Sequence, residues 1–80
     1  MDDLSKRING KVLDLKQVTG GYNLVNSTNK SHSYCFIPED DLHYVKADLV
    51  AFPHDDYVYR LKLVQNNHWA LYNVTSQWAD

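Results

Sequence analysis

Two runs near the C-terminus, residues 57–64 and 68–75, alternate between apolar and polar side chains and are separated by Gln65-Asn66-Asn67. A period of two is typical of strands with one buried face, and asparagine readily takes the positive φ angles of tight turns. The pattern predicts an antiparallel hairpin with Asn66-Asn67 as its two-residue loop. A lone hairpin is marginally stable in water, so further strands must complete the fold.

The two-residue loop predicts which side chains of this hairpin share a face. One face would carry apolar side chains and would be the core side: Tyr57, Tyr59, Leu61, Leu63, Ala70, Tyr72 and Val74. The opposite face would carry Val58, Arg60, Lys62, Val64, Trp69 and Leu71. This register makes the second face a candidate surface.

That outward face is the candidate site for a partner, because tryptophan and arginine are enriched where interfaces gain most of their energy. The expected partner-binding residues are Val58, Arg60, Lys62, Trp69 and Leu71, with Trp78 beyond the last strand. The alternative is that Trp69 packs under a helix or a neighbouring strand as part of the core. The sequence leaves both readings open.

Three more strands are expected upstream. Residues 11–18 and 22–25 are β-prone and flank Thr19-Gly20-Gly21, where glycines can supply positive φ, so they predict a second hairpin. Residues 26–31 are all polar and predict an exposed loop, after which residues 32–37 predict a third strand.

Two segments have helical features. Residues 2–9 place acids before bases, with Leu4 and Ile8 on one face and Gly10 at the C-cap position. Residues 38–48 begin with proline and acids, but they also carry the alternation of a strand. We expect a short N-terminal helix, a helix early in 38–48, extended chain near 50–52, and a turn at 53–56.

These elements predict a single, mainly β domain over residues 1–80, because 80 residues are too few for two cores. The expected architecture is an antiparallel sheet of about five strands or a small barrel. A short helix followed by about five strands resembles the barrels of the SH3 and Sm type, in architecture only. A small α+β sheet with the Pro38 helix packed across it is the rival.

The single cysteine, Cys35, excludes an intramolecular disulfide and favours a reducing compartment. The N-terminal residues contain no apolar run like a signal-peptide core, and no segment is as long as a membrane span. The expected location is the cytoplasm, without membrane association.

The candidates for chemistry are few. His32 and Cys35, with His43 and His54 further on, could be imagined as zinc ligands, or Cys35 as a nucleophile beside a histidine. The spacing lacks the paired ligands of a structural zinc site, and the acid pairs Asp40-Asp41 and Asp55-Asp56 fit a helix start and a turn. We expect no metal, no cofactor, no catalytic residue and no enzyme.

The function predicted from these features is a small protein-interaction module that binds another protein or a second copy of itself. The alternative is a nucleic-acid-binding barrel in which Arg60 and Lys62 neutralise phosphates while Trp69 or Tyr22 stacks on bases. A net charge of −2 favours the first, because affinity from phosphate contacts requires a basic surface.

Overall fold

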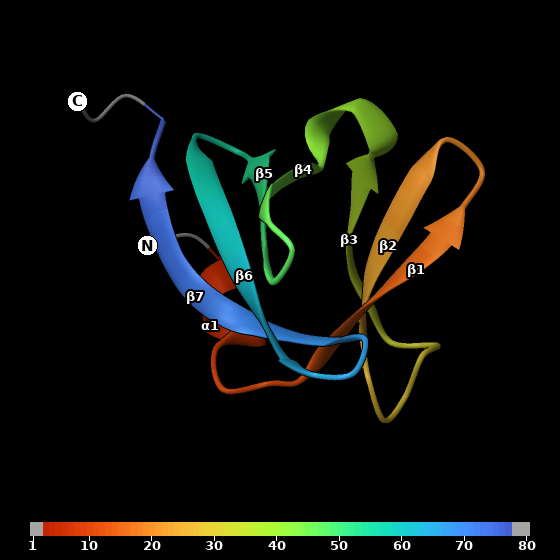
Figure 1. Cartoon of the computed structure of the whole chain (residues 1–80). Helices are drawn as coiled ribbons and strands as arrows, with labels where there is room; N and C mark the ends of the chain where they lie inside the picture. Colours follow the sequence, from red (N-terminus) through yellow and green to blue (C-terminus); the bar gives the residue numbers. More distant parts are fainter. Residues whose placement is uncertain (1–2, 78–80) are drawn as a thin grey trace.

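The computed structural model describes residues 3–77, and most of these residues form one antiparallel sheet (Figure 1). The helix is α1 (Asp3–Ile8), and the strands are β1 (Leu13–Val18), β2 (Gly21–Asn26), β3 (Ser33–Pro38), β4 (His43–Lys46), β5 (Leu49–His54), β6 (Tyr57–Gln65) and β7 (His68–Ser76). A 3₁₀ turn, η1 (Glu39–Asp41), connects β3 to β4. The mainly β class and the short N-terminal helix are confirmed, whereas the expected count of about five strands is wrong.

The sheet has seven strands in the order β3-β2-β1-β7-β6-β5-β4 and stays open between its two edges, so the expected closed barrel is also wrong. Every pairing is antiparallel, which means that the edge strands β3 and β4 run in the same direction. Parallel neighbours need a crossover of roughly a dozen residues or more. Only residues 39–42 connect β3 to β4, so these two strands cannot pair.

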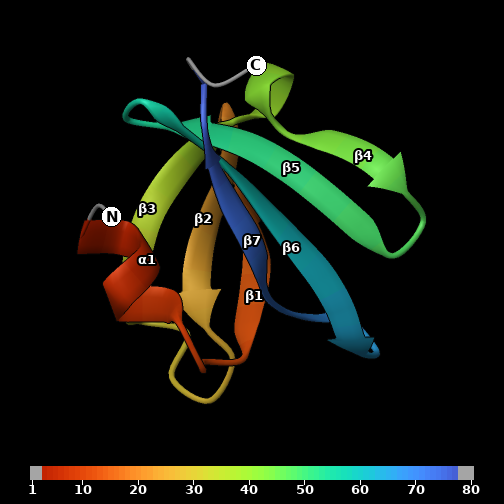
Figure 2. The ribbon, with the colours of Figure 1, turned by 90° about the vertical axis from the view of Figure 1, so that its left-hand side faces the viewer.

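Two meanders, β1–β3 and β4–β7, meet at one narrow junction. The register between β1 and β7 contains a single pair, Leu13 with Trp69. β7 begins at His68, directly after the β6–β7 turn, so the rest of β1 runs past its end. The meanders therefore splay apart as two arms (Figures 1 and 2).

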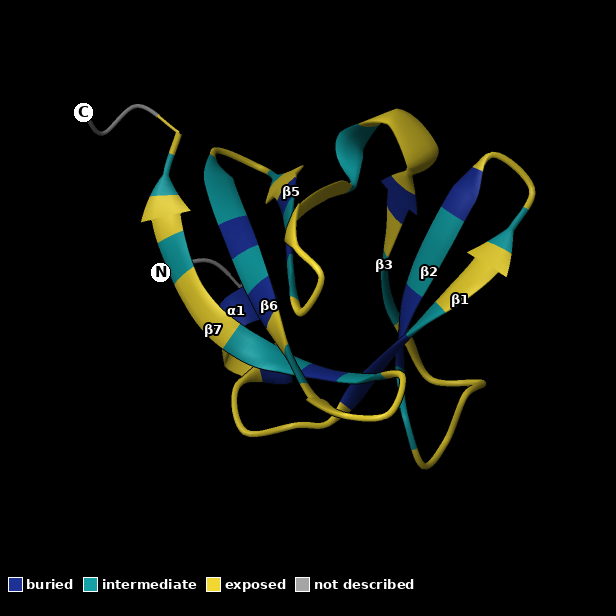
Figure 3. Cartoon of the chain, viewed as in Figure 1, coloured by how far each residue is buried: buried dark blue, intermediate teal, exposed yellow. Residues whose placement is uncertain are grey.

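The core lies between the arms and is covered on one side by α1. Figure 3 shows buried positions on α1 and on strands of both arms. Phe52 stacks on Tyr59 with ring centroids 5.4 Å apart. The central cluster contains Leu4, Ile8, Leu13, Leu24, Ile37, Val50, Phe52, Tyr59, Leu61 and Trp69.

The predicted hairpin of β6 and β7 is confirmed, but its expected register is wrong between Trp69 and Tyr72. Bulges insert Val64 in β6 and Tyr72 in β7, so that Leu63 faces Trp69 and Leu61 faces Leu71. Each bulge adds one residue, and a one-residue slip exchanges the faces of a strand. Trp69 is therefore only 6% exposed, whereas Tyr72 is 58% exposed on the outer face.

The helix expected within residues 38–48 is wrong, and with it the rival sheet covered by that helix. Proline and the acids that follow it form only η1, after which the chain becomes the edge strand β4. Val45, which a helix would have buried, is 53% exposed. The expected extended chain near 50–52 is confirmed as part of β5.

The upstream hairpin, the third strand and the exposed loop are confirmed. Gly20 makes the β1–β2 turn with φ of 84°, as expected of its position. The turn expected at 53–56 is wrong for its first two residues, because Pro53 and His54 pair with β6 as the end of β5. In the shorter turn that follows, Asp55 takes φ of 48°, and Asn67 in the β6–β7 turn takes 62°. The glycine, aspartate and asparagine residues near these positions therefore indicated the turns in the sequence.

Gly21 occupies a position without room for a side chain, and this generates a prediction. A Cβ there would lie 2.2 Å from the carbonyl oxygen of Ile37. We expect Gly21→Ala to lower the free energy of unfolding by about 2–3 kcal/mol, measured by urea denaturation. Gly10→Ala is the control: Gly10 has φ of 78° but open space around it. It should cost only about 1–2 kcal/mol, and a Gly21→Ala protein as stable as the wild type would contradict the crowding.

Candidate functional site

A cleft of about 340 Å³ opens between the two arms of the sheet. Its lining comes from both meanders and from the loop after β2: Asp14, Leu15, Tyr22, Lys30, Tyr44, Asn67 and Trp69. The volume is within the range of small-ligand and side-chain pockets. The splaying of the arms at the β1–β7 junction thus creates the main candidate site.

Aromatic side chains form much of this cleft. Trp69 is held on the core side by the bulged register of β7, and Tyr44 reaches it from β4. Their ring centroids are 6.3 Å apart and their planes meet at 73°, an edge-to-face arrangement. Tyr44 itself is 64% exposed, so the Tyr44 ring is accessible to a ligand while Trp69 lies deeper.

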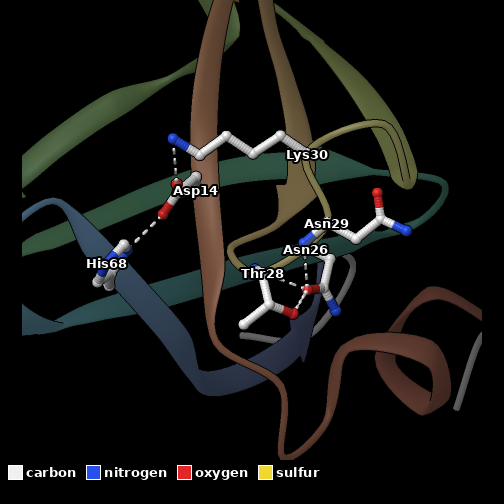
Figure 4. A network of polar contacts seen from close by, with 6 residues as sticks. All are labelled: Asp14, Asn26, Thr28, Asn29, Lys30 and His68. Carbon is white, nitrogen blue, oxygen red and sulfur yellow. Dashed lines mark hydrogen bonds and ion pairs between the residues drawn. The ribbon is translucent and has the colours of Figure 1, made fainter.

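A carboxylate with two polar neighbours forms the other part of the cleft (Figure 4). Asp14 Oδ1 lies 2.6 Å from Nδ1 of His68, and Asp14 Oδ2 lies 3.5 Å from Nζ of Lys30. Because Leu13 pairs with Trp69, the next residues, Asp14 and His68, are cross-strand neighbours. The junction of the arms therefore also places a nearly buried carboxylate beside the aromatic rings.

The polar loop that carries Lys30 is organised by two asparagines. The Asn26 side-chain oxygen accepts hydrogen bonds from the backbone N–H groups of Thr28 and Asn29. The Asn29 side-chain oxygen accepts from the backbone and hydroxyl of Ser31. These local bonds give the loop a defined course without core contacts, and Lys30 extends from it toward Asp14 (Figure 4).

The strand beside the cleft has an unpaired side. Within the described residues, positions 15–18 of β1 pair with β2 and with no strand on the other side. Lys16 and Gln17 on this segment are exposed. An edge of this kind presents backbone N–H and C=O groups that an added strand could use.

The structure does not gather the sequence-predicted partner-binding residues into one exposed surface. Trp69 is core and cleft lining, and Leu71 packs against the core. Val58 is half-buried, and Arg60 Nη1 donates a 3.0 Å hydrogen bond to Thr75 Oγ1. Lys62 is exposed, whereas Trp78 lies outside the described residues.

Sequence reasoning missed Asp14, Lys30 and Tyr44 as site residues. They belong to three separate segments, and no spacing within any one segment marks them. One feature of the sequence pointed toward the site: it left open which residues would cover the Trp69 side chain. Only the pairing of distant strands brings these residues together.

The environment of Cys35 is also unlike that of a catalytic thiol. Burial raises its pKa from 9.0 to about 11, an effect that the nearby Arg7 opposes only in part. The thiol therefore stays protonated near neutral pH, and protonated thiols are poor nucleophiles and metal ligands. Among residues 3–77, no three His, Cys, Asp or Glu side chains are grouped closely enough to hold a metal ion.

Comparison of the chain with protein-family models, with curated proteins and with solved structures found no match. In the part of the chain that the structure describes, no helix is long and apolar enough to cross a membrane. The assignment of a function therefore depends on the chemistry of the cleft and of the strand edges.

The raised pKa of Cys35 predicts slow alkylation. A rise from 9.0 to about 11 leaves about 100-fold less thiolate at pH 8 in the folded protein than in the unfolded chain. Iodoacetamide labelling followed by mass spectrometry should therefore be about 100-fold slower without denaturant than in 8 M urea. The folded rate should keep rising with pH up to about 11. Equal rates in the two conditions would show that the thiol is not desolvated.

Proposed function

We propose that this protein is a non-catalytic interaction module that holds an extended segment of a partner protein along the unpaired side of β1. The observation that carries the proposal is the joint position of this strand edge and the aromatic cleft. In the part of the chain that the structure describes, residues 15–18 of β1 have only β2 as a neighbouring strand, and Leu15 in that segment also lines the cleft. Strand addition provides backbone hydrogen bonds, and the cleft provides selectivity for a side chain.

The two outer edges of the sheet are less suited to this role. β4 has four residues, contains a bulge and ends at Lys46, three features that discourage strand addition. At β3, Arg7 Nη1 donates a 3.4 Å hydrogen bond to the carbonyl oxygen of Tyr34, the residue left out of the β2 register. The segment 15–18 of β1 is also four residues long and carries Lys16, but its register with β2 is regular and contains no bulge.

Aromatic side chains support the same assignment. Tyrosine and tryptophan are enriched among the residues that dominate binding energy, because large rigid rings lose little freedom on burial. Tyr44 is exposed and already held by its contact with Trp69, so a partner would find it preorganised. The cytoplasm remains the proposed location, and a second copy of the chain is another candidate for the added strand.

A displayed library of random twelve-residue peptides tests this function. Selected peptides should bind the wild type, and Tyr44→Ala should weaken them about tenfold because it removes an aromatic contact. Tyr72→Ala is the matched control, since Tyr72 is 58% exposed but lies outside the cleft. Affinities can be followed by tryptophan fluorescence.

In the same peptides, N-methylation at alternate residues should abolish binding if backbone pairing with β1 is used. The absence of any selected peptide, or equal binding by Tyr44→Ala, would contradict the proposal. Sedimentation equilibrium of the protein without peptide tests whether a second copy of the chain occupies the edge of β1, in which case a dimer would be observed.

Nucleic-acid binding is the second candidate function, and one surface feature favours it. Lys46, Lys62 and Tyr72 line a shallow depression on the outer face, where Tyr72 replaces Trp69 as the exposed ring expected beside basic side chains. Asp48 also lines this depression and opposes phosphate binding there. Cations with an exposed ring can bind a single strand by charge and stacking.

This second candidate predicts binding of a fluorescent single-stranded oligonucleotide that weakens roughly tenfold or more between 50 and 200 mM salt. Fluorescence anisotropy measures it, and Lys62→Ala should weaken it further because one phosphate contact is lost. Lys11→Ala, an exposed lysine outside the depression, is the control. No binding at 50 mM salt would exclude this function.

A further inference from the structure

The cleft already contains a cationic side chain from the protein itself. Lys30 Nζ lies 3.5 Å from Asp14 Oδ2, and Lys30 lines the cleft together with Tyr22, Tyr44 and Trp69. The Asp14 side chain is 13% exposed, so its carboxylate is the nearly buried charge of the cleft. An ammonium group beside a carboxylate, in a cleft that aromatic side chains also line, indicates the class of ligand that this cleft favours.

We propose that the cleft binds an alkylated ammonium group that retains an N–H, as in a mono- or dimethylated lysine side chain of the partner, and that this group displaces Lys30. The inference rests on the proposed function, because the lysine belongs to the segment that pairs with β1. Asp14 and the three aromatic side chains are the ligand-binding residues. Lys30 competes with this ligand for the Asp14 carboxylate.

The aromatic rings account for the preference for an alkylated group. The faces of tyrosine and tryptophan rings attract cations, and alkylated ammonium groups are recognised in clusters of such rings. An unmodified ammonium is compact and strongly hydrated, so it loses more hydration free energy when it moves from water to the face of an aromatic ring. Tyr44 and Trp69 both line the cleft and meet edge to face at 73°, so their ring planes differ in orientation.

The Asp14 carboxylate explains why the bound ammonium group must retain an N–H. Asp14 Oδ1 is engaged by His68 at 2.6 Å, and Oδ2 is the oxygen that faces Lys30. A ligand that replaces Lys30 must offer Oδ2 a hydrogen bond to keep this oxygen paired, since a carboxylate is an acceptor only. A trimethylated ammonium has no N–H and would leave Oδ2 without that bond.

Lys30 is a displaceable occupant. Its side chain is 64% exposed, and its 3.5 Å separation from Asp14 is longer than a strong charge-assisted hydrogen bond. Only the lysine side of this pair is exposed, and long exposed side chains gain little free energy from a single ion pair. The loop is held by Asn26 and Asn29, so Lys30 can leave Asp14 without disturbing the loop's local hydrogen bonds.

The test uses acetylated lysine amides that are unmethylated, monomethylated, dimethylated or trimethylated, and an uncharged analogue with a tert-butyl group. In a Trp78→Phe background, Trp69 is the single tryptophan and reports occupancy of the cleft. The dimethylated probe should bind about tenfold more tightly than the unmethylated and trimethylated probes. The uncharged analogue should show no saturable change.

Substitutions in the cleft distinguish the role of Lys30 as a competitor from the role of Asp14 as a ligand-binding residue. Lys30→Ala should tighten the dimethylated probe severalfold by removing the competitor, whereas Lys11→Ala, an exposed lysine outside both the cleft lining and β1, should leave it unchanged. Asp14→Asn should weaken the dimethylated probe more than the trimethylated one, because only the dimethylated probe also loses a charge-assisted hydrogen bond, with folding checked by thermal unfolding. If Asp14→Asn does not fold, Tyr44→Ala gives the independent test and should weaken the dimethylated probe about tenfold.

Equal binding of the charged and uncharged probes, no dependence on methylation, or no effect of Lys30→Ala would overturn the inference. These outcomes can be told apart from a failure of the proposed strand-binding function. Selected peptides that lack lysine but still require Tyr44 would retain the interaction module and remove the cation preference. Failure of both the peptides and the lysine probes would remove both.

Discussion

Among residues 3–77, the pairing of Leu13 with Trp69 is the strand pairing that joins the two meanders into a single sheet. Both side chains lie in the core, and burial of such large apolar groups contributes on the order of 1.5–3 kcal/mol each. The neighbouring contact of Asp14 with His68 continues the junction by one residue. The sheet stays open between β3 and β4, and the shortness of the β1–β7 junction lets its two arms diverge.

A short junction has two structural consequences that meet at one place. The outer half of β1 keeps an unpaired side, and the divergence of the arms leaves a cleft lined by Tyr22, Tyr44 and Trp69. A longer pairing of β1 with β7 would have covered the edge of β1 and narrowed the cleft. The proposed binding of an extended segment, and of an alkylated ammonium within it, depends on this incomplete sheet.

The local elements were largely predictable, because each depends on neighbours in sequence. The β6–β7 hairpin, the glycine turn at Gly20 and the short N-terminal helix have signals within a few residues. The candidate site was not predictable, since Asp14, Lys30 and Tyr44 converge only through strand pairing. The segment after Pro38 carried both helical and strand patterns, and its role as an edge strand was decided by contact with β5.

The sequence by itself determined the mainly β class and the turns, because alternation, glycine and asparagine act through local backbone geometry. Only the tertiary structure decided the position of Trp69. Two bulges shift β7 by one residue between Trp69 and Tyr72, which exchanges the buried and exposed faces of that segment. A bulge has little signature in the sequence, because its extra residue is favoured by packing across the sheet, where burial of Trp69 outweighs the regular ladder.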